Sequence, residues 1–222
     1  MDIISLEQSD RLYWLGRYAE RVYTTIGLFF DAYDTMLDKF DMEYKDFCRK
    51  LNIPNIYEGP LDFCERYAFD AADGNSIISN LLRAYDNAIV LREEIGSEAL
   101  CYIQLAIYDM QKTASSDAPL IGFQKVQDNL MAFWGICDDH IANNVVRNIL
   151  KLGKRHERVD LYVRLNRETD AVTREALRFE DYLKRSGVKY NQQALLEFKE
   201  HLKAESFDYA KAIEICEKLL TL

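Results

Sequence analysis

The chain has 222 residues, of which 49% are hydrophobic and 12% aromatic, and this composition excludes the polar, aromatic-poor class of disordered proteins. Its 37 acidic and 28 basic residues give a net charge of −9, which argues against a nucleic-acid or anionic-membrane partner because those surfaces recruit basic proteins. The cysteines lack the spacing of zinc or redox sites, the N-terminus lacks a signal sequence, and no stretch reaches the roughly 18 apolar residues of a membrane span. We therefore expect a cytoplasmic protein without a metal or cofactor.

Apolar residues recur at three- and four-residue spacing between only three prolines, which predicts an all-α fold, a helical bundle built on long antiparallel helices. Ser5 and Gln8 form a candidate capping box for a long helix near residues 6–40. The stretch 52–60 contains two prolines and a glycine and indicates a connection. A short helix should follow over about residues 61–71.

Ser76 is a candidate cap for a second long helix that should continue to Thr113, with Gly96 as a weak point in its interior. Hydrophobic spacing then predicts helices over about residues 120–140, 143–167, 169–185, 192–204 and 209–220.

The most informative pattern is a segment that occurs twice. Leu15–Val22 reads LGRYAERV and Leu152–Val159 reads LGKRHERV, so both contain Gly-basic-x-x-Glu-Arg-Val. This internal repeat indicates a duplicated helical unit. A glycine inside a helix costs about 0.5–1 kcal/mol relative to alanine, so Gly16 and Gly153 predict a close approach of the two helix backbones.

The angular positions of the charged residues around the helix axis predict how the two copies meet. Glu20 lies about 40° from Gly16 and Arg21 about 140° from it, and the second copy repeats this layout. Helices that cross at the two glycines would let Glu20 reach Arg158 and Glu157 reach Arg21. His156 replaces Ala19 in the apolar stripe and is expected to be a core or interface histidine.

Two interpretations of this charged cluster remain open. It is either a buried structural ion-pair network or a site that binds a carboxylate or a phosphate through guanidinium groups, and Arg155 adds to its basic charge. Nothing in the spacing identifies a catalytic residue. The candidate cluster consists of Arg17, Glu20, Arg21, Lys154, Glu157 and Arg158.

The other motifs indicate no metal site, nucleophile or ATP-binding loop. His140 and His201 lie near acidic residues but lack the spacing of a metal site, so no metal is predicted. Cys137 lacks the surroundings of a nucleophile and is interpreted as buried. The sequence also lacks the glycine-rich loop with which many proteins bind ATP phosphates.

The segment Leu12–Arg21 closely resembles the opening block of the alpha-E family, a predicted helical domain with a repeated Glu-Arg motif. Weaker similarity follows at four positions of the next block, and a third block contains the second Glu-Arg copy. The resemblance covers about residues 5–165, so we expect a single domain, 1–222, with a C-terminal helical appendage over 166–222. The four weaker positions are Asn87, Arg92, Ser97 and Glu98.

The resemblance implies a function only indirectly. Bacterial-type proteins of this family typically accompany ATP-grasp ligase-like and transglutaminase-like proteins, so the implied role is a non-catalytic binding or scaffold component of a system that forms peptide or amide bonds. One alternative is an enzyme component that uses the Glu-Arg cluster for amide formation or acyl transfer. A purely structural helical module is the other, and the oligomeric state stays open.

Overall fold

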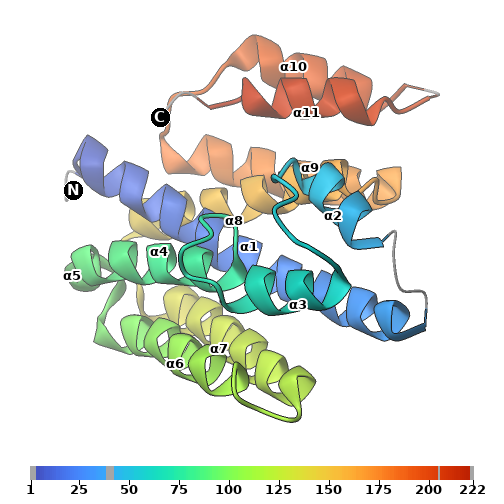
Figure 1. Ribbon diagram of the computed structural model, residues 1–222. Coiled ribbons are helices and arrows are strands. Elements are labelled where there is room, and N and C mark those ends of the chain that lie inside the picture. Colours follow the sequence, from blue (N-terminus) through green and yellow to red (C-terminus); the bar gives the residue numbers. More distant parts are fainter. Residues whose placement is uncertain (1–3, 39–42, 205, 221–222) are drawn as a thin grey trace.

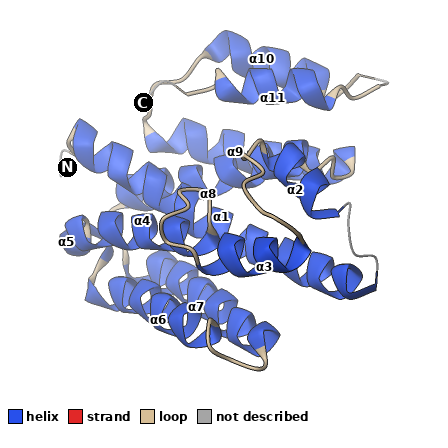
Figure 2. Cartoon of the chain, in the orientation of Figure 1, coloured by secondary structure: helices blue, strands red, loops and turns tan. Residues whose placement is uncertain are grey.

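A computed structural model describes residues 4–38, 43–204 and 206–220 of the chain. Within these residues, 78% of the chain lies in helices and no strand is present; Figure 2 accordingly shows blue helices and tan loops but no red strand. The all-α prediction is therefore confirmed. The eleven helices of the described residues are α1 (Leu6–Asp38), α2 (Glu43–Leu51), α3 (Pro60–Phe69), α4 (Ile77–Val90), α5 (Arg92–Ile95), α6 (Ser97–Thr113), α7 (Pro119–His140), α8 (Asn144–Arg164), α9 (Thr169–Ser186), α10 (Gln192–His201) and α11 (Tyr209–Glu217).

Helix α1 is the longest helix and organises the others around it (Figure 1). It packs most extensively on α8 and then on α4, while α6 pairs with α7 and α9 packs on α8. The last two helices lie side by side at one end of the molecule, and α11 contacts α8. A bundle of this kind buries one apolar stripe of each helix and leaves the opposite faces to solvent.

The beginning of α1 follows from its local sequence. The Ser5 hydroxyl oxygen accepts a hydrogen bond from the Gln8 amide nitrogen at 3.1 Å, and the Gln8 side chain accepts one from the Ser5 amide at 3.0 Å. This reciprocal pair satisfies two backbone donors that a helix start otherwise leaves open. The side chains of residues 31–43 lie outside the described part, as does the predicted helix end near residue 40.

Two features differ from the sequence-based expectations. The helix predicted from Ser76 to Thr113 is wrong as one element, because it is divided into α4, α5 and α6. Gly96 has a φ of +85°, a left-handed conformation that interrupts a helix and that glycine adopts without strain. The Ser76 cap is present, since its side chain accepts a hydrogen bond from the Ser79 amide.

Helix α2 is the second difference, because the sequence analysis predicted no element there. Tyr44, Phe47 and Cys48 are buried at three- and four-residue spacing, so the periodic signal was present within a short segment. These side chains pack with Phe63 of α3 and Tyr67 in one aromatic group. The Phe63 ring also lies beside Phe29 of α1, with the two ring centres 6.3 Å apart.

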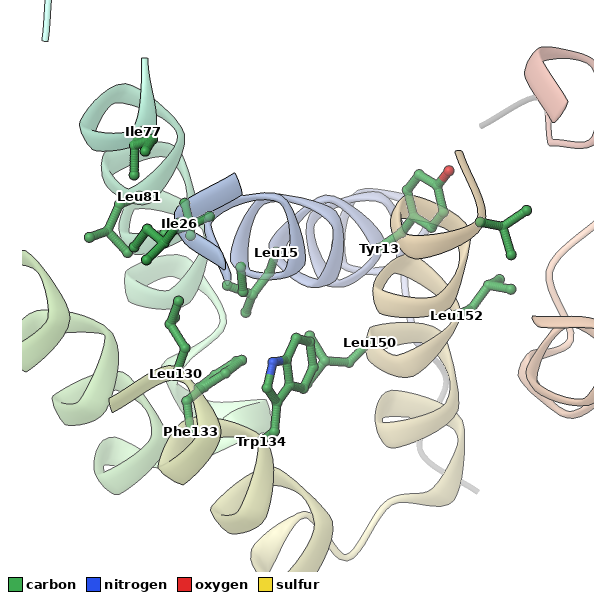
Figure 3. Packing of buried hydrophobic residues seen from close by; sticks show 14 of the residues in the cluster. Tyr13, Leu15, Ile26, Ile77, Leu81, Leu130, Phe133, Trp134, Leu150 and Leu152 are labelled. Carbon is green, nitrogen blue, oxygen red and sulfur yellow. The ribbon is translucent and has the colours of Figure 1, made fainter. Parts of the chain in front are cut away.

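The main core lies where α1, α4, α7 and α8 meet. Figure 3 shows Leu15 of α1 and Leu150 of α8 near Trp134 of α7, with Leu81 of α4 and Leu130 of α7 further along the same interior. All five side chains are at most 4% exposed. Within the described residues, no helix is long and apolar enough to cross a membrane.

Candidate functional site

The two glycines of the repeated segment allow α1 and α8 to touch backbone to backbone. A Cβ atom placed on Gly16 would overlap the carbonyl oxygen of Leu150, and one placed on Gly153 would overlap the carbonyl oxygen of Tyr13. Each overlapped carbonyl lies three residues before the opposite glycine. The contact is therefore reciprocal, with the same positions of the two copies facing each other across a local pseudo-twofold axis.

The Glu-Arg dipeptides meet across the same contact. Arg158 donates from Nε to Oε1 of Glu20 at 2.5 Å, and Arg21 donates from Nε to Oε1 of Glu157 at 2.5 Å. Both glutamate side chains are completely buried. We call this set of two glutamates and two arginines, together with the two glycines, the clasp. Sequence position alone indicated this pairing, because each dipeptide follows its glycine by the same four residues.

The clasp is asymmetric beyond these shared pairs. On the Glu157 side, Arg17 donates from Nε to the second carboxylate oxygen at 2.6 Å, so both oxygens of Glu157 bind an arginine. Burial alone would raise the pKa of Glu157, but Arg17 and Arg21 outweigh it and hold the pKa at about 2. This side of the clasp therefore contains a carboxylate that is ionised at neutral pH and binds an arginine through each of its oxygens.

On the Glu20 side, the second oxygen has no such partner. Oε1 accepts hydrogen bonds from Arg158 and from the Thr24 hydroxyl, which lies at 3.0 Å. Oε2 is buried and, within the described residues, has no hydrogen-bond partner. Lys154 occupies the position equivalent to Arg17, but its ammonium group lies over the Trp134 ring, 4.0 Å from the ring centre. Burial lowers the pKa of Lys154 to about 8.

Residues around the clasp extend the network on the Glu157 side. The Tyr13 hydroxyl accepts a hydrogen bond from Arg17 at 3.3 Å and forms another, at 2.6 Å, with Nδ1 of His156. His156 is buried, as its place in the apolar stripe predicts, and this burial lowers its pKa to about 3. Nδ1 of the neutral ring can therefore accept a hydrogen bond from the tyrosine hydroxyl.

Asp160 completes this side of the network. It binds Arg164 at 3.0 Å and Arg17 at 3.4 Å. Burial and the nearby charge of Glu157 raise its pKa. The sequence analysis missed Tyr13, Asp160 and Arg164 as members of the network, although Asp160 follows Glu157 by three residues and so lies on the same helix face.

The other residues singled out from the sequence lie elsewhere. Arg155 points to α9, where it binds Glu175 at 2.8 Å. Asn87 accepts a weak hydrogen bond from Arg11, Arg92 donates to Ser97, and Glu98 pairs with His140 at the surface. These four family-like positions belong to α4, α5 and α6 and do not join the clasp. Cys137 is buried, as predicted.

A cavity lies on each side of the clasp. The first, of about 440 Å³, adjoins the Glu157 side and is lined by aromatic residues and by arginines that already bind carboxylates, including Arg17, Arg21 and Arg164. The second, of about 570 Å³, adjoins the Glu20 side and is lined by Lys154, Arg155, Arg158 and Arg167 together with neutral residues. Among the described residues, no group of three or more metal-binding side chains is found.

Comparison with known proteins places this architecture in one family. Residues 8–208 match Alpha-E, described as a predicted alpha-helical domain with a conserved ER motif. The match contains both Glu-Arg dipeptides of the clasp and continues well beyond residue 165. No curated protein and no solved structure matches the chain. The protein belongs to the Alpha-E family.

Proposed function

We propose that this protein is a non-catalytic binding component of a system that forms peptide or amide bonds, and that an ATP-grasp ligase-like protein is its partner. The clasp supports the non-catalytic part of this proposal, and the partner is the one that the family resemblance implies. Its glutamates are fully buried, and three arginines of the repeated segments bind them directly. A carboxylate that is buried and paired with arginines in this way serves poorly as a general base, because the ion pairs and the burial restrict its access to a substrate proton.

The cavities beside the clasp support a binding role. The clasp fixes α1 against α8, so the residues of these helices that line both cavities hold defined positions. Rigid walls of this kind reduce the entropy lost when a ligand binds. The sequence lacks a glycine-rich phosphate loop, so in this proposal the partner supplies the nucleotide and the activated acyl group.

The test combines the purified protein with an ATP-grasp ligase-like protein encoded in the same genome. We expect one complex by size-exclusion chromatography with light scattering, and ATP turnover by the ligase that rises when the complex forms. The protein alone should hydrolyse no ATP. Absence of a complex with such ligases, or unchanged turnover in a complex, would contradict the proposal.

The second candidate is an enzyme component, and one observation favours it. The buried Oε2 of Glu20 lacks a hydrogen-bond partner in the described structure, and Lys154 nearby has a lowered pKa of about 8. These are properties of groups that exchange protons. In this alternative, Glu20→Gln would abolish turnover by the complex while leaving the complex itself intact. In the scaffold proposal, turnover by the Glu20→Gln complex stays within about threefold of wild type.

A further inference from the structure

The second cavity has an unusual charge for this protein. The chain as a whole carries a net charge of −9, yet the cavity of about 570 Å³ is lined by four basic residues and by no acidic one. Three of the four come from a single turn of α8 and the fourth follows this helix. The cavity-lining cations are Lys154, Arg155, Arg158 and Arg167.

Nearby carboxylates neutralise only part of this charge. Glu20 binds Arg158 and Glu175 binds Arg155, while Asp138 pairs with Lys151. Glu175 is shared with Arg178. Within the described residues, neither Lys154 nor Arg167 has a carboxylate within salt-bridge distance. Two positive charges of the cavity therefore remain without a direct counter-charge.

The cavity-lining cations also have hydrogen-bond donors that lack a protein partner within the described residues. Nε of Arg155 is buried and has no hydrogen-bond partner in the described residues. Among the charged and aromatic groups of the described residues, the Lys154 ammonium contacts only the face of the Trp134 ring. A cation–π contact satisfies an ammonium less fully than a carboxylate does. A partly buried cation without a full set of partners is less stable than a paired one, and an anion that supplies the missing charge reduces that cost.

We propose that this cavity binds a small dianionic ligand, a phosphate group or a dicarboxylate, through Lys154, Arg155, Arg158 and Arg167. Because two cations of the cavity lack a direct counter-charge, a ligand with two negative charges would neutralise them. Arg158 also holds Glu20 of the clasp, so the ligand would sit directly beside the α1–α8 contact. The cavity wall continues along Leu28 and Met131, which gives room for an apolar body attached to the anionic group. This inference deepens the proposed function and rests on its binding role, without depending on the identity of the partner.

The test measures binding by isothermal titration calorimetry at constant ionic strength, with inorganic phosphate, glutarate and acetate as separate ligands. We expect phosphate or glutarate to bind at least about tenfold more tightly than acetate, since a second charge adds a charge-assisted contact. The stronger of the two identifies the source of the dianion. No binding of either dianion, or equal binding of all three anions, would overturn the proposal.

Variants locate the site. Lys154→Met should weaken dianion binding about tenfold or more. Lys151→Met is the matched control, because it removes the same charge from the same helix while Lys151 pairs with Asp138, and it should bind like the wild type. Equal loss in both variants would indicate a nonspecific charge effect and refute the site.

A second variant keeps the proposal testable if Lys154→Met fails to fold. Arg167 is exposed beyond the end of α8, so Arg167→Gln should fold normally and weaken binding about threefold or more. Unchanged affinity in both Arg167→Gln and a folded Lys154→Met would also refute the proposal. The two proposals can fail separately. A protein that binds dianions but forms no complex with an ATP-grasp ligase-like protein would refute the proposed function and leave the dianion site supported.

Discussion

The two sides of the clasp start from nearly the same sequence and have different chemistry. On one side, Arg17 and Arg21 each bind one oxygen of Glu157. On the other, a lysine occupies the position of Arg17, one oxygen of Glu20 has no described partner, and a basic cavity adjoins it. An Arg-to-Lys difference between equivalent positions, together with the neighbours that α7 and α9 supply, therefore accompanies the change from a fully paired carboxylate to one with an unbonded oxygen.

The largest effect should come from breaking the closed side. Glu157→Gln removes the fully buried charge that two partly buried arginines share, so we expect the free energy of unfolding to fall by about 3–5 kcal/mol. Glu20→Gln should cost less, about 1–3 kcal/mol, because only Arg158 loses a charged partner and the amide can still accept its hydrogen bond. Urea denaturation of both variants measures the difference. Glu214→Gln, on the exposed face of α11, is the control and should unfold like the wild type.

The second-largest loss of stability should come from disturbing the backbone contact between α1 and α8, which both sides of the clasp share. Gly16→Ala places a Cβ atom into the backbone of α8, and Gly153→Ala does the same to α1. Forcing the helices apart should lower the free energy of unfolding by about 1–3 kcal/mol in each variant. Gly135→Ala is a matched helical control, because a Cβ there meets no atom within 4 Å, and it should be neutral or stabilising by about 0.5–1 kcal/mol. Equal melting temperatures for Gly16→Ala and Gly135→Ala would refute the close contact.

A pH dependence should distinguish the Glu157 side through His156. The folded protein keeps this ring neutral down to a pKa of about 3, whereas the ordinary value of 6.5 applies to the unfolded chain. The unfolded state therefore binds the extra proton as the pH falls below about 6.5, and stability should decrease by about 1.4 kcal/mol per pH unit.

The same sign applies to Glu157 at lower pH. Its pKa of about 2 lies below the ordinary 4.5, so its contribution is present above pH 4.5 and is lost below it. Asp160 acts in the opposite direction, because its pKa is raised. Denaturant unfolding between pH 5 and 7 isolates the histidine. His156→Gln should flatten the slope there, while the surface variant His140→Gln should retain it; a steep slope in His156→Gln would contradict the assignment.

The smallest effect should come from making the two sides alike. Lys154→Arg supplies a guanidinium that can bind Oε2 of Glu20 as Arg17 binds Glu157, so we expect a gain of about 1 kcal/mol in the free energy of unfolding. The reciprocal change, Arg17→Lys, should cost about 1–2 kcal/mol by leaving one oxygen of Glu157 unbound. Thermal melts of the two single variants suffice. The comparison fails if both substitutions change stability in the same direction.

The sequence predicted the parts of this structure that depend on local pattern. The Ser5–Gln8 cap, the course of α1 and the reciprocal meeting of the Glu-Arg dipeptides all follow from spacing along one helix. The interruption at Gly96 was underestimated, because a lone glycine inside an apolar pattern is compatible either with a helix interior or with a positive φ. Helix α2 was missed because only three buried residues, Tyr44, Phe47 and Cys48, mark its helical spacing within a segment that is otherwise mostly charged.

The asymmetry of the clasp was beyond sequence reasoning for a different reason. It depends on partners that other helices bring to the crossing, such as Trp134 of α7 beneath Lys154 and Glu175 of α9 beside Arg155. The position of these side chains follows from where α1 and α6 hold α7 and from how α9 packs on α8, and helical spacing within α8 carries no information about it.

On the Glu157 side of the clasp, ion pairs within the protein occupy both carboxylate oxygens, and we propose that the Glu20 side accepts a dianion. A crystal structure of the protein grown in phosphate would distinguish the two sides. We expect a phosphate held by Lys154 and Arg158 in the second cavity, with Arg17 and Arg21 still on Glu157 and no anion beside them. A phosphate bound to Arg17 and Arg21, or an empty second cavity with Lys154 paired to Glu20, would contradict it.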